Sequence, residues 1–146
     1  MTLLKTILLL LFLGYLGMAA ALYFAQTPIL FPARLVPLAG PLPPGARALV
    51  AETPSGEALH GLHIAPDGAA GEGPVLLAFG GNGWNAQAAA AYLHDIFPER
   101  DVVAFHYRGY RPSSGSPSAE ALLADASIVH EAVVRRIPAP PVVAVG

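Results

Sequence analysis

The sequence predicts an α/β domain that follows a membrane-spanning segment, and three observations support this fold class. The first is an uncharged stretch over residues 6–33 with an almost wholly apolar core. The second is an element order of two strands followed by strand, helix, strand, helix and strand, which is typical of a parallel sheet with helices on its faces. The third is a glycine-rich segment, residues 79–85, that lies between a buried-type strand and a helix.

Composition narrows the class of protein further. A chain of 146 residues holds one domain at most once the apolar segment is set aside. The net charge of −2 and the 12% of charged residues leave no basic face for a nucleic-acid partner. Because the chain has no cysteine, disulfides and cysteine-based zinc sites are excluded.

The N-terminal segment is long enough to cross a bilayer, because a helix of about 20 apolar residues spans the hydrocarbon layer. We therefore expect residues 1–25 to be an uncleaved transmembrane signal anchor, with residues 6–25 in the lipid bilayer. A cleaved signal peptide with small residues at Ala19–Ala21 is the alternative, but its apolar region is usually only about 7–15 residues long. Lys5 precedes the span and Arg34 follows it. This weak asymmetry slightly favours a single-pass protein with a periplasmic or extracytoplasmic domain.

The next segment, residues 26–47, is expected to be a linker. It contains six prolines, at positions 28, 32, 37, 41, 43 and 44. Proline removes a backbone donor and disrupts helix interiors, so the segment is predicted to be extended and semi-rigid rather than helical. The remaining residues, 48–146, are assigned to the α/β domain.

Apolar periodicity and turn residues place the elements of this domain. Asn85 is expected to cap the first helix, and Ser116 the second, with Pro117 at its first position. The predicted elements are strands at 48–52, 59–65, 75–79, 102–107 and 142–145, and helices at 86–97 and 117–136.

The glycine-rich segment is the strongest candidate for chemistry. Backbone N–H groups at a strand end and helix N-terminus suit an anion or a developing oxyanion. The same residues also match a dinucleotide fingerprint, Gly81-x-Gly83-x-x-Ala86. That fingerprint requires a carboxylate after the next strand, where this chain has no acid but has Arg108, which could meet the 2′-phosphate of NADP. A glycine turn without chemistry is the third interpretation.

A resemblance becomes visible when two segments are considered together. These are Phe79-Gly80-Gly81-Asn82-Gly83 and the segment 106–117, which reads His-Tyr-Arg-Gly-Tyr-Arg-Pro-Ser-Ser-Gly-Ser-Pro. They resemble the α/β-hydrolase superfamily, and are most similar to the Bem46-like (alpha/beta-hydrolase domain-containing) membrane-anchored serine hydrolases. The resemblance implies the first five strands and two helices of an α/β-hydrolase sheet. It also implies hydrolysis of an ester, thioester or amide of a small acyl substrate, without a cofactor.

The resemblance also implies roles for single residues. Gly81 and Asn82 would supply oxyanion-hole donors from their backbones, and Arg108 and Tyr110 would brace the loop. Three positions depart from the family pattern: its loop histidine is Phe79 or Gly80 here, its strand-end aspartate is His106, and an expected glycine is Arg111.

The last strand leads to Gly146, which matches the first glycine of the G-x-S-x-G nucleophile elbow. The serine, acid and histidine of the family then follow beyond Gly146. We therefore expect an N-terminal fragment that has no catalytic residue of its own and is inactive as given. The serines of residues 113–118 are expected to be ordinary loop residues.

Metal binding is not expected, because His60 and His63 point to opposite faces of a strand. His94 and His130 each lie on a helix without a partner at metal spacing, and Asp125 is expected to be a surface or bracing carboxylate. A non-catalytic, membrane-anchored binding module remains the alternative to a hydrolase.

Overall fold

The computed structural model describes residues 2–68, 73–137 and 141–146, and the chain divides into two units, Met1–Leu30 and Phe31–Gly146. All the predicted strands and helices are present, with small shifts at their ends. In chain order the elements are α1 (Thr2–Leu30), β1 (Arg47–Glu52), β2 (Ala58–Ile64), β3 (Val75–Ala78), α2 (Ala86–Ile96), β4 (Val102–Phe105), α3 (Ala119–Arg136) and β5 (Val142–Val145).

The first unit is the single helix α1. It has 29 residues and contains an 18-residue stretch with a mean hydropathy of 2.3, so it is long and apolar enough to span a membrane. The helix includes Pro28 and ends at Leu30. The expectation that residues 26–47 contain no regular helix is therefore wrong for residues 26–30. Pro28 lies in the last turn, where its missing N–H removes a single helical hydrogen bond.

The second unit contains a five-stranded sheet with the order β1-β2-β4-β3-β5. β3 pairs in parallel with β4 and β5, as the strand–helix alternation predicts. β1 and β2 instead form an antiparallel hairpin, and β2 pairs antiparallel with β4, with Leu62 opposite Ala104. The sheet is therefore mixed rather than parallel throughout. The short turn between β1 and β2 requires an antiparallel pair, because a parallel pair needs a long crossover.

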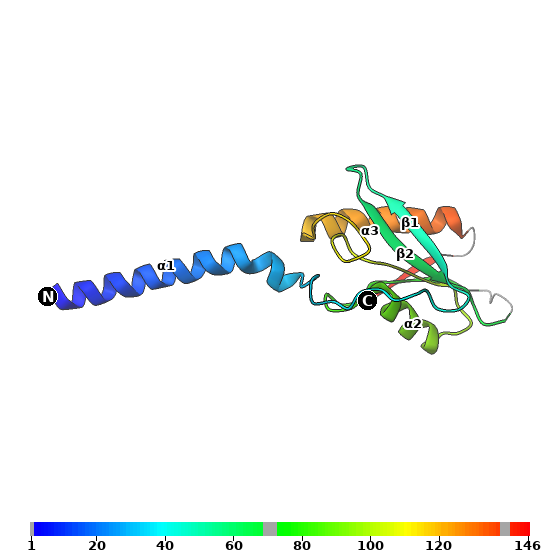
Figure 1. The fold of residues 1–146 in the computed structure, drawn as a ribbon, viewed down its shortest axis with the longest axis horizontal. Coiled ribbons are helices and arrows are strands. Elements are labelled where there is room, and N and C mark those ends of the chain that lie inside the picture. The colour runs from blue at the N-terminus through cyan, green and yellow to red at the C-terminus, as the bar shows by residue number, and fades with distance from the viewer. Residues whose placement is uncertain (1, 69–72, 138–140) are drawn as a thin grey trace. The chain divides into compact units, whose positions relative to one another are not determined.

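Each face of the sheet is covered by one helix, and Figure 1 shows α2 and α3 on opposite sides of the strands. Leu59 of β2 packs in the cluster that includes Val129 and Val133 of α3. Leu62, three positions along the same strand, packs in the cluster that includes Ala90 and Leu93 of α2. All four residues of β3 and of β4 are buried, as expected for strands covered on both faces. The domain is thus an α/β sandwich of three layers.

The capping residues of α2 and α3 mark where the preceding loops end. Asn85 caps α2 as predicted, since its Oδ1 accepts a hydrogen bond from the Ala88 N–H at 2.8 Å. The predicted cap of α3 is wrong: the capping residue is Ser118 rather than Ser116, with its Oγ accepting from the Ala121 N–H at 3.1 Å. Pro117 belongs instead to the preceding loop, where it packs against Gly109: a Cβ at Gly109 would lie 2.5 Å from its Cδ.

Candidate functional site

The glycine-rich segment, residues 79–85, lies at the carboxyl ends of the parallel strands. The Phe79 N–H donates to the Val145 carbonyl at 2.7 Å. A Cβ at Gly146 would lie 3.4 Å from the Phe79 carbonyl oxygen. The loop after β3 and the residue after β5, which the sequence identified separately, are therefore direct neighbours. This edge is where ligands usually bind in open α/β sheets.

An apolar cavity of about 400 Å³ opens at this point. The rings of Trp84 and Tyr92, which meet edge to face at 5.8 Å between centroids, form part of its wall. Gly80, Gly81, Val145 and Gly146 also line it. Among the described residues, the amide of Gly81 has no hydrogen-bond acceptor. Gly81 is exposed and lines this cavity, so its amide is available to a ligand there.

None of the glycines in this loop has a left-handed backbone conformation. Other glycines of the domain, such as Gly109 and Gly115, do. The space at Gly80 is tight, because a Cβ there would lie 3.2 Å from the Cβ atoms of both Ala89 and Trp84. Gly81 and Gly83 have nothing within 4 Å of the position of a Cβ. These two glycines thus leave the surface above the loop open to a ligand.

Two tyrosines from the loop after β4 hold the glycine-rich segment in place. The Tyr107 hydroxyl donates to the Gly80 carbonyl at 2.5 Å, and the Tyr110 hydroxyl donates to the Asn82 carbonyl at 3.0 Å. Burial raises the pKa of both tyrosines, with a further contribution from Tyr110 at Tyr107, so both hydroxyls keep the proton that they donate. Tyr110 therefore contacts the glycine-rich segment, and its bracing role stays a prediction. Tyr107 was not selected from the sequence, because its position in the strand-end motif gave no sign of the contact.

Arg108 also has a bracing geometry, but it acts on other elements than the glycine-rich segment. Its guanidinium forms two hydrogen bonds to Asp125 of α3, at 3.0 and 2.5 Å, and one to Glu57 beside β2, at 3.0 Å. Asp125 is only 6% exposed, so it is a buried bracing carboxylate rather than a surface one. Hydrogen bonds from Ser55 and Thr53 lower the pKa of Glu57 to about 2, with smaller contributions from its own backbone N–H and from Arg108.

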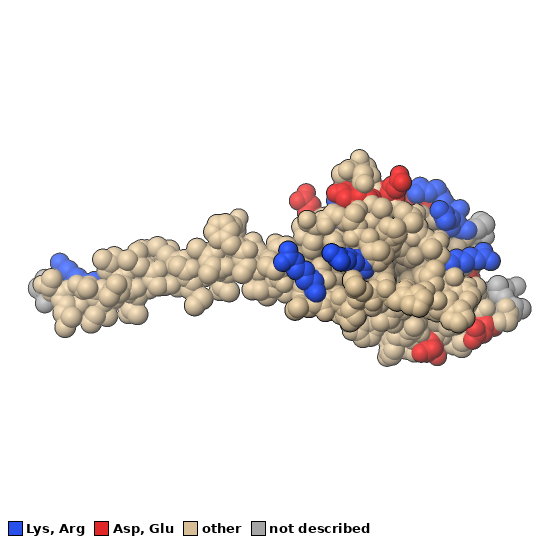
Figure 2. All heavy atoms as spheres, in the orientation of Figure 1, with Lys and Arg blue, Asp and Glu red and all other residues tan. Residues whose placement is uncertain are grey.

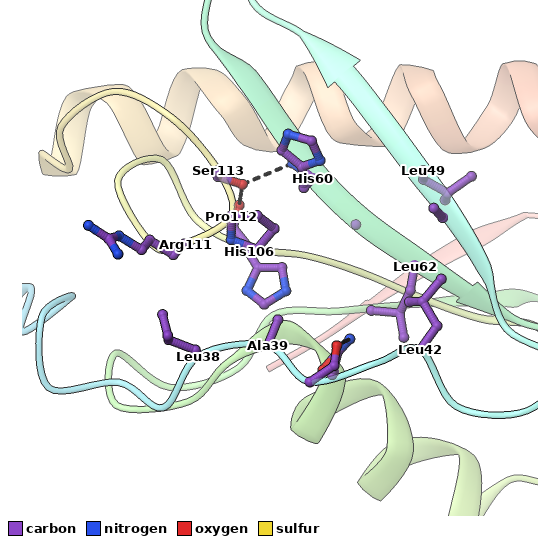
Figure 3. Close-up of a pocket in the computed structure, with 14 residues that line it drawn as sticks. Leu38, Ala39, Leu42, Leu49, His60, Leu62, His106, Arg111, Pro112 and Ser113 are labelled. Carbon is purple, nitrogen blue, oxygen red and sulfur yellow. Dashed lines mark hydrogen bonds between the residues drawn. The ribbon is translucent and has the colours of Figure 1, made fainter.

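His106 directly follows Phe105, the last residue of β4. Its Nδ1 lies 3.5 Å from the Ala86 N–H at the start of α2 and accepts that hydrogen bond. Burial, followed by the nearby His60, lowers its pKa to about 4, so the ring is neutral at pH 7. Ser113 donates to the His106 carbonyl at 2.8 Å and accepts from the His60 N–H at 2.9 Å (Figure 3). Ser113 thus ties the loop to β2, in keeping with an ordinary loop serine.

His106, His60 and Ser113 border a larger cavity, of about 680 Å³, which Figure 3 shows between the loop after β4 and residues 38–42. This cavity contains none of the amides of the glycine-rich segment. We therefore place the candidate site in the smaller cavity, which Gly80 and Gly81 line.

Two further histidines, His63 and His94, each lie beside an aspartate. His63 contacts Asp101 at 2.6 Å, and His94 lies 3.5 Å from Asp67. Within the described ranges, no three His, Cys, Asp or Glu side chains lie close enough to hold a metal ion.

Comparisons with known proteins place this geometry in context. No protein-family profile matches the chain. An uncharacterised protein found in two strains of Mycobacterium tuberculosis is 37% identical over 105 residues, which cover 65% of this chain and 36% of that protein. The chain thus spans about a third of the length of the curated relatives it matches.

Several solved structures that share this arrangement of elements are described as hydrolases or esterases. An alpha-beta hydrolase from Vibrio vulnificus aligns with a TM-score of 0.52 at 23% identity, over 64% of this chain and 31% of its own. An esterase from Pyrococcus furiosus gives 0.55 at 16% identity, over 70% and 41%. A serine hydrolase without a lid from Xanthomonas campestris gives 0.53 at 24% identity, over 72% and 52%. The mixed sheet and the two helices that cover it are therefore part of an α/β-hydrolase fold.

Proposed function

We propose that this chain forms the N-terminal part of a membrane-anchored serine hydrolase that acts on an ester, thioester or amide of a small acyl substrate. The observation that carries the proposal is that the open Gly81 amide and Gly146, at the end of β5, line the same apolar cavity. A nucleophilic serine presented just after β5 would face this amide. The amide of Gly81, with that of Asn82 beside it, would then stabilise the oxyanion of the tetrahedral intermediate.

The proposal divides the active site between residues 1–146 and residues beyond them, and the partial coverage of the solved structures is compatible with this. The matched regions cover between 31% and 52% of the three solved structures described above. In this proposal the serine, acid and histidine come from residues beyond Gly146, and residues 1–146 supply the oxyanion donors and the braces around them. The chain alone would then be inactive, because binding and an oxyanion hole retain only a small part of triad catalysis.

The anchor is the second part of the proposal. The helix α1 would cross the bilayer once and remain attached, with Lys5 on the cytoplasmic side and the domain on the other side. The length and mean hydropathy of α1 support a membrane span, and the charge asymmetry around it supports the orientation.

An NADP-type dinucleotide site is less compatible with the same loop. Pyrophosphate binds to free N–H groups at a helix N-terminus. In α2, the Ala86 N–H donates to His106 and the Ala88 N–H donates to Asn85, so two of these donors are already used. His106 also takes the place where the fingerprint needs a carboxylate.

A pair of substitutions at one position tests the oxyanion assignment in the protein encoded by the complete reading frame. Gly81→Pro removes the amide proton, whereas Gly81→Ala keeps it and enters open space. With a p-nitrophenyl ester as substrate, we expect Gly81→Pro to lower kcat by about 10²–10³ and Gly81→Ala to stay close to the unmodified protein. Equal activity of the two variants, with unchanged melting temperatures, would remove Gly81 from the site. Micromolar binding of NADPH would instead favour the dinucleotide interpretation.

A further inference from the structure

Two arginines line another hollow of the domain, which has no role in the proposed hydrolase reaction. Arg34 belongs to the segment that follows α1, and Arg111 belongs to the loop after β4. Together with Ala33, Val36, Leu38 and Gly109, they line a cavity of about 580 Å³. Figure 2 shows basic groups on a stretch of the domain surface whose surrounding atoms belong to uncharged residues.

These two arginines differ from Arg108 in their electrostatic surroundings. Arg108 is neutralised by two carboxylates, whereas neither Arg34 nor Arg111 takes part in an ion pair within the described part of the chain. The hollow has no acidic lining residue, and the sequence contains no Asp or Glu before Glu52. Two guanidinium groups that share one hollow without an anion repel each other, and a bound anion would relieve this repulsion.

Two leucines close to Arg34 in the sequence are exposed. Leu35 is 84% exposed and Leu38 is 65% exposed, although both are large aliphatic side chains. Exposed leucines beside arginines are typical of segments that lie in the interface of a bilayer, where the aliphatic groups enter the acyl region and the cations stay at the headgroups. Arg34 follows Leu30, the last residue of α1, by four positions, so the chain keeps it within about 14 Å of the end of that helix.

We propose that the hollow between Arg34 and Arg111 binds the phosphate group of a membrane phospholipid. Each guanidinium can donate two parallel hydrogen bonds to phosphate oxygens, which is the geometry that arginine provides and lysine does not. Leu35 and Leu38 would contact the upper part of the acyl chains. Arg111 stands where the resemblance leads us to expect glycine, so this chain carries a cation that the loop itself does not require. The inference rests on α1 lying in a bilayer and is independent of the hydrolase chemistry.

Lipid binding to the full chain in a non-ionic detergent tests this inference. The ligand is dioleoyl phosphatidylglycerol, the phosphate-free comparison is dioleoylglycerol, and the readout is the apparent Kd from native mass spectrometry. Arg34→Gln and Arg111→Gln should each weaken binding of the phospholipid about fivefold, and the double variant about 20-fold or more. Arg136→Gln, which removes the same charge at an exposed position at the end of α3, should change the Kd less than twofold.

Further measurements in the same assay show which part of the lipid is recognised. Dioleoylglycerol should bind equally to all variants, and Arg111→Lys should retain part of the phospholipid affinity. Because both arginines are exposed and unpaired within the described residues, the melting temperatures of the variants should equal that of the unmodified chain. Equal affinity of all variants for phosphatidylglycerol would overturn the inference. Displacement of the lipid by millimolar glycerol 1-phosphate would also overturn it, because the ligand would then be a soluble phosphate compound.

Discussion

Arg108 connects three parts of the domain, and its removal should be the most damaging single change to a charged side chain. In Arg108→Met the aliphatic stem is retained, but the buried carboxylate of Asp125 loses both of its guanidinium hydrogen bonds. Breaking a buried ion pair by removing one partner typically costs about 3–5 kcal/mol. We take the lower end, about 3 kcal/mol, because the side chains of Arg108 and Asp125 retain 13% and 9% exposure.

Urea unfolding of the full chain in non-ionic detergent measures this cost, with the fluorescence of Trp84, the single tryptophan, as the signal. For an m-value of about 2 kcal/mol/M, a loss of 3 kcal/mol lowers the urea midpoint by about 1.5 M. Arg135→Met is the matched control, because it breaks an exposed pair with Glu131 on the surface of α3. Such a pair is worth about 0.3–0.5 kcal/mol, so its midpoint should fall by about 0.2 M.

A double variant separates the lost attraction from the unpaired charge. Arg108→Met combined with Asp125→Leu removes the buried carboxylate as well, and most of the lost stability should return. A midpoint for Arg108→Met within about 0.3 M of the unmodified chain would refute the reasoning, because Asp125 would then be well solvated without its partner.

Three further predictions concern packing and protonation. Gly61→Ala should destabilise the domain by about 1–3 kcal/mol in the same urea assay, because the new Cβ would lie 2.6 Å from the Ala104 carbonyl oxygen. The control Gly83→Ala enters open space and should leave the midpoint unchanged. Equal midpoints for the two variants would contradict the packing of β2 on β4. The pKa of Glu57 falls from 4.5 to about 2 on folding, so the stability that its carboxylate contributes is complete above pH 4.5 and disappears as the pH falls towards 2. The difference in urea midpoint between the unmodified chain and Glu57→Gln should shrink over this range. A difference that stays constant would exclude the pKa shift. The C2 proton of His106 should titrate in NMR spectra with a pKa near 4, and a midpoint near 6.5 would show that the ring is not buried.

The parts of the fold that were predictable from the sequence are those set by local patterns. The continuous apolar runs at β3 and β4 indicated burial on both faces, and both strands are fully buried. Asn85 marked the start of α2 correctly, because a capping side chain acts on its own helix. Ser116 was the wrong cap for α3. Pro117 packs against Gly109 and belongs to the loop, and no local pattern of capping residues reveals this contact.

Features that depend on contacts between distant segments could not be predicted. The antiparallel pairing of β2 with β4 follows from the assembled sheet, and no local pattern specifies it. The burial of Asp125 depends on Arg108, which reaches α3 from the loop after β4. At the candidate site, the sequence identified the glycine-rich segment and Tyr110. It did not identify Tyr107, whose hydroxyl meets a carbonyl 27 positions earlier in the chain.

The central claim is that the glycine-rich segment faces a nucleophilic serine presented just after β5. Treatment of the protein encoded by the complete reading frame with a fluorophosphonate probe, followed by peptide mapping of the label, tests this claim most directly. The account predicts a single labelled serine in a G-x-S-x-G sequence that begins at Gly146. A label on Ser113 or on any other serine of residues 1–146, a reading frame without such a sequence, or a folded full-length protein that takes up no label would contradict it.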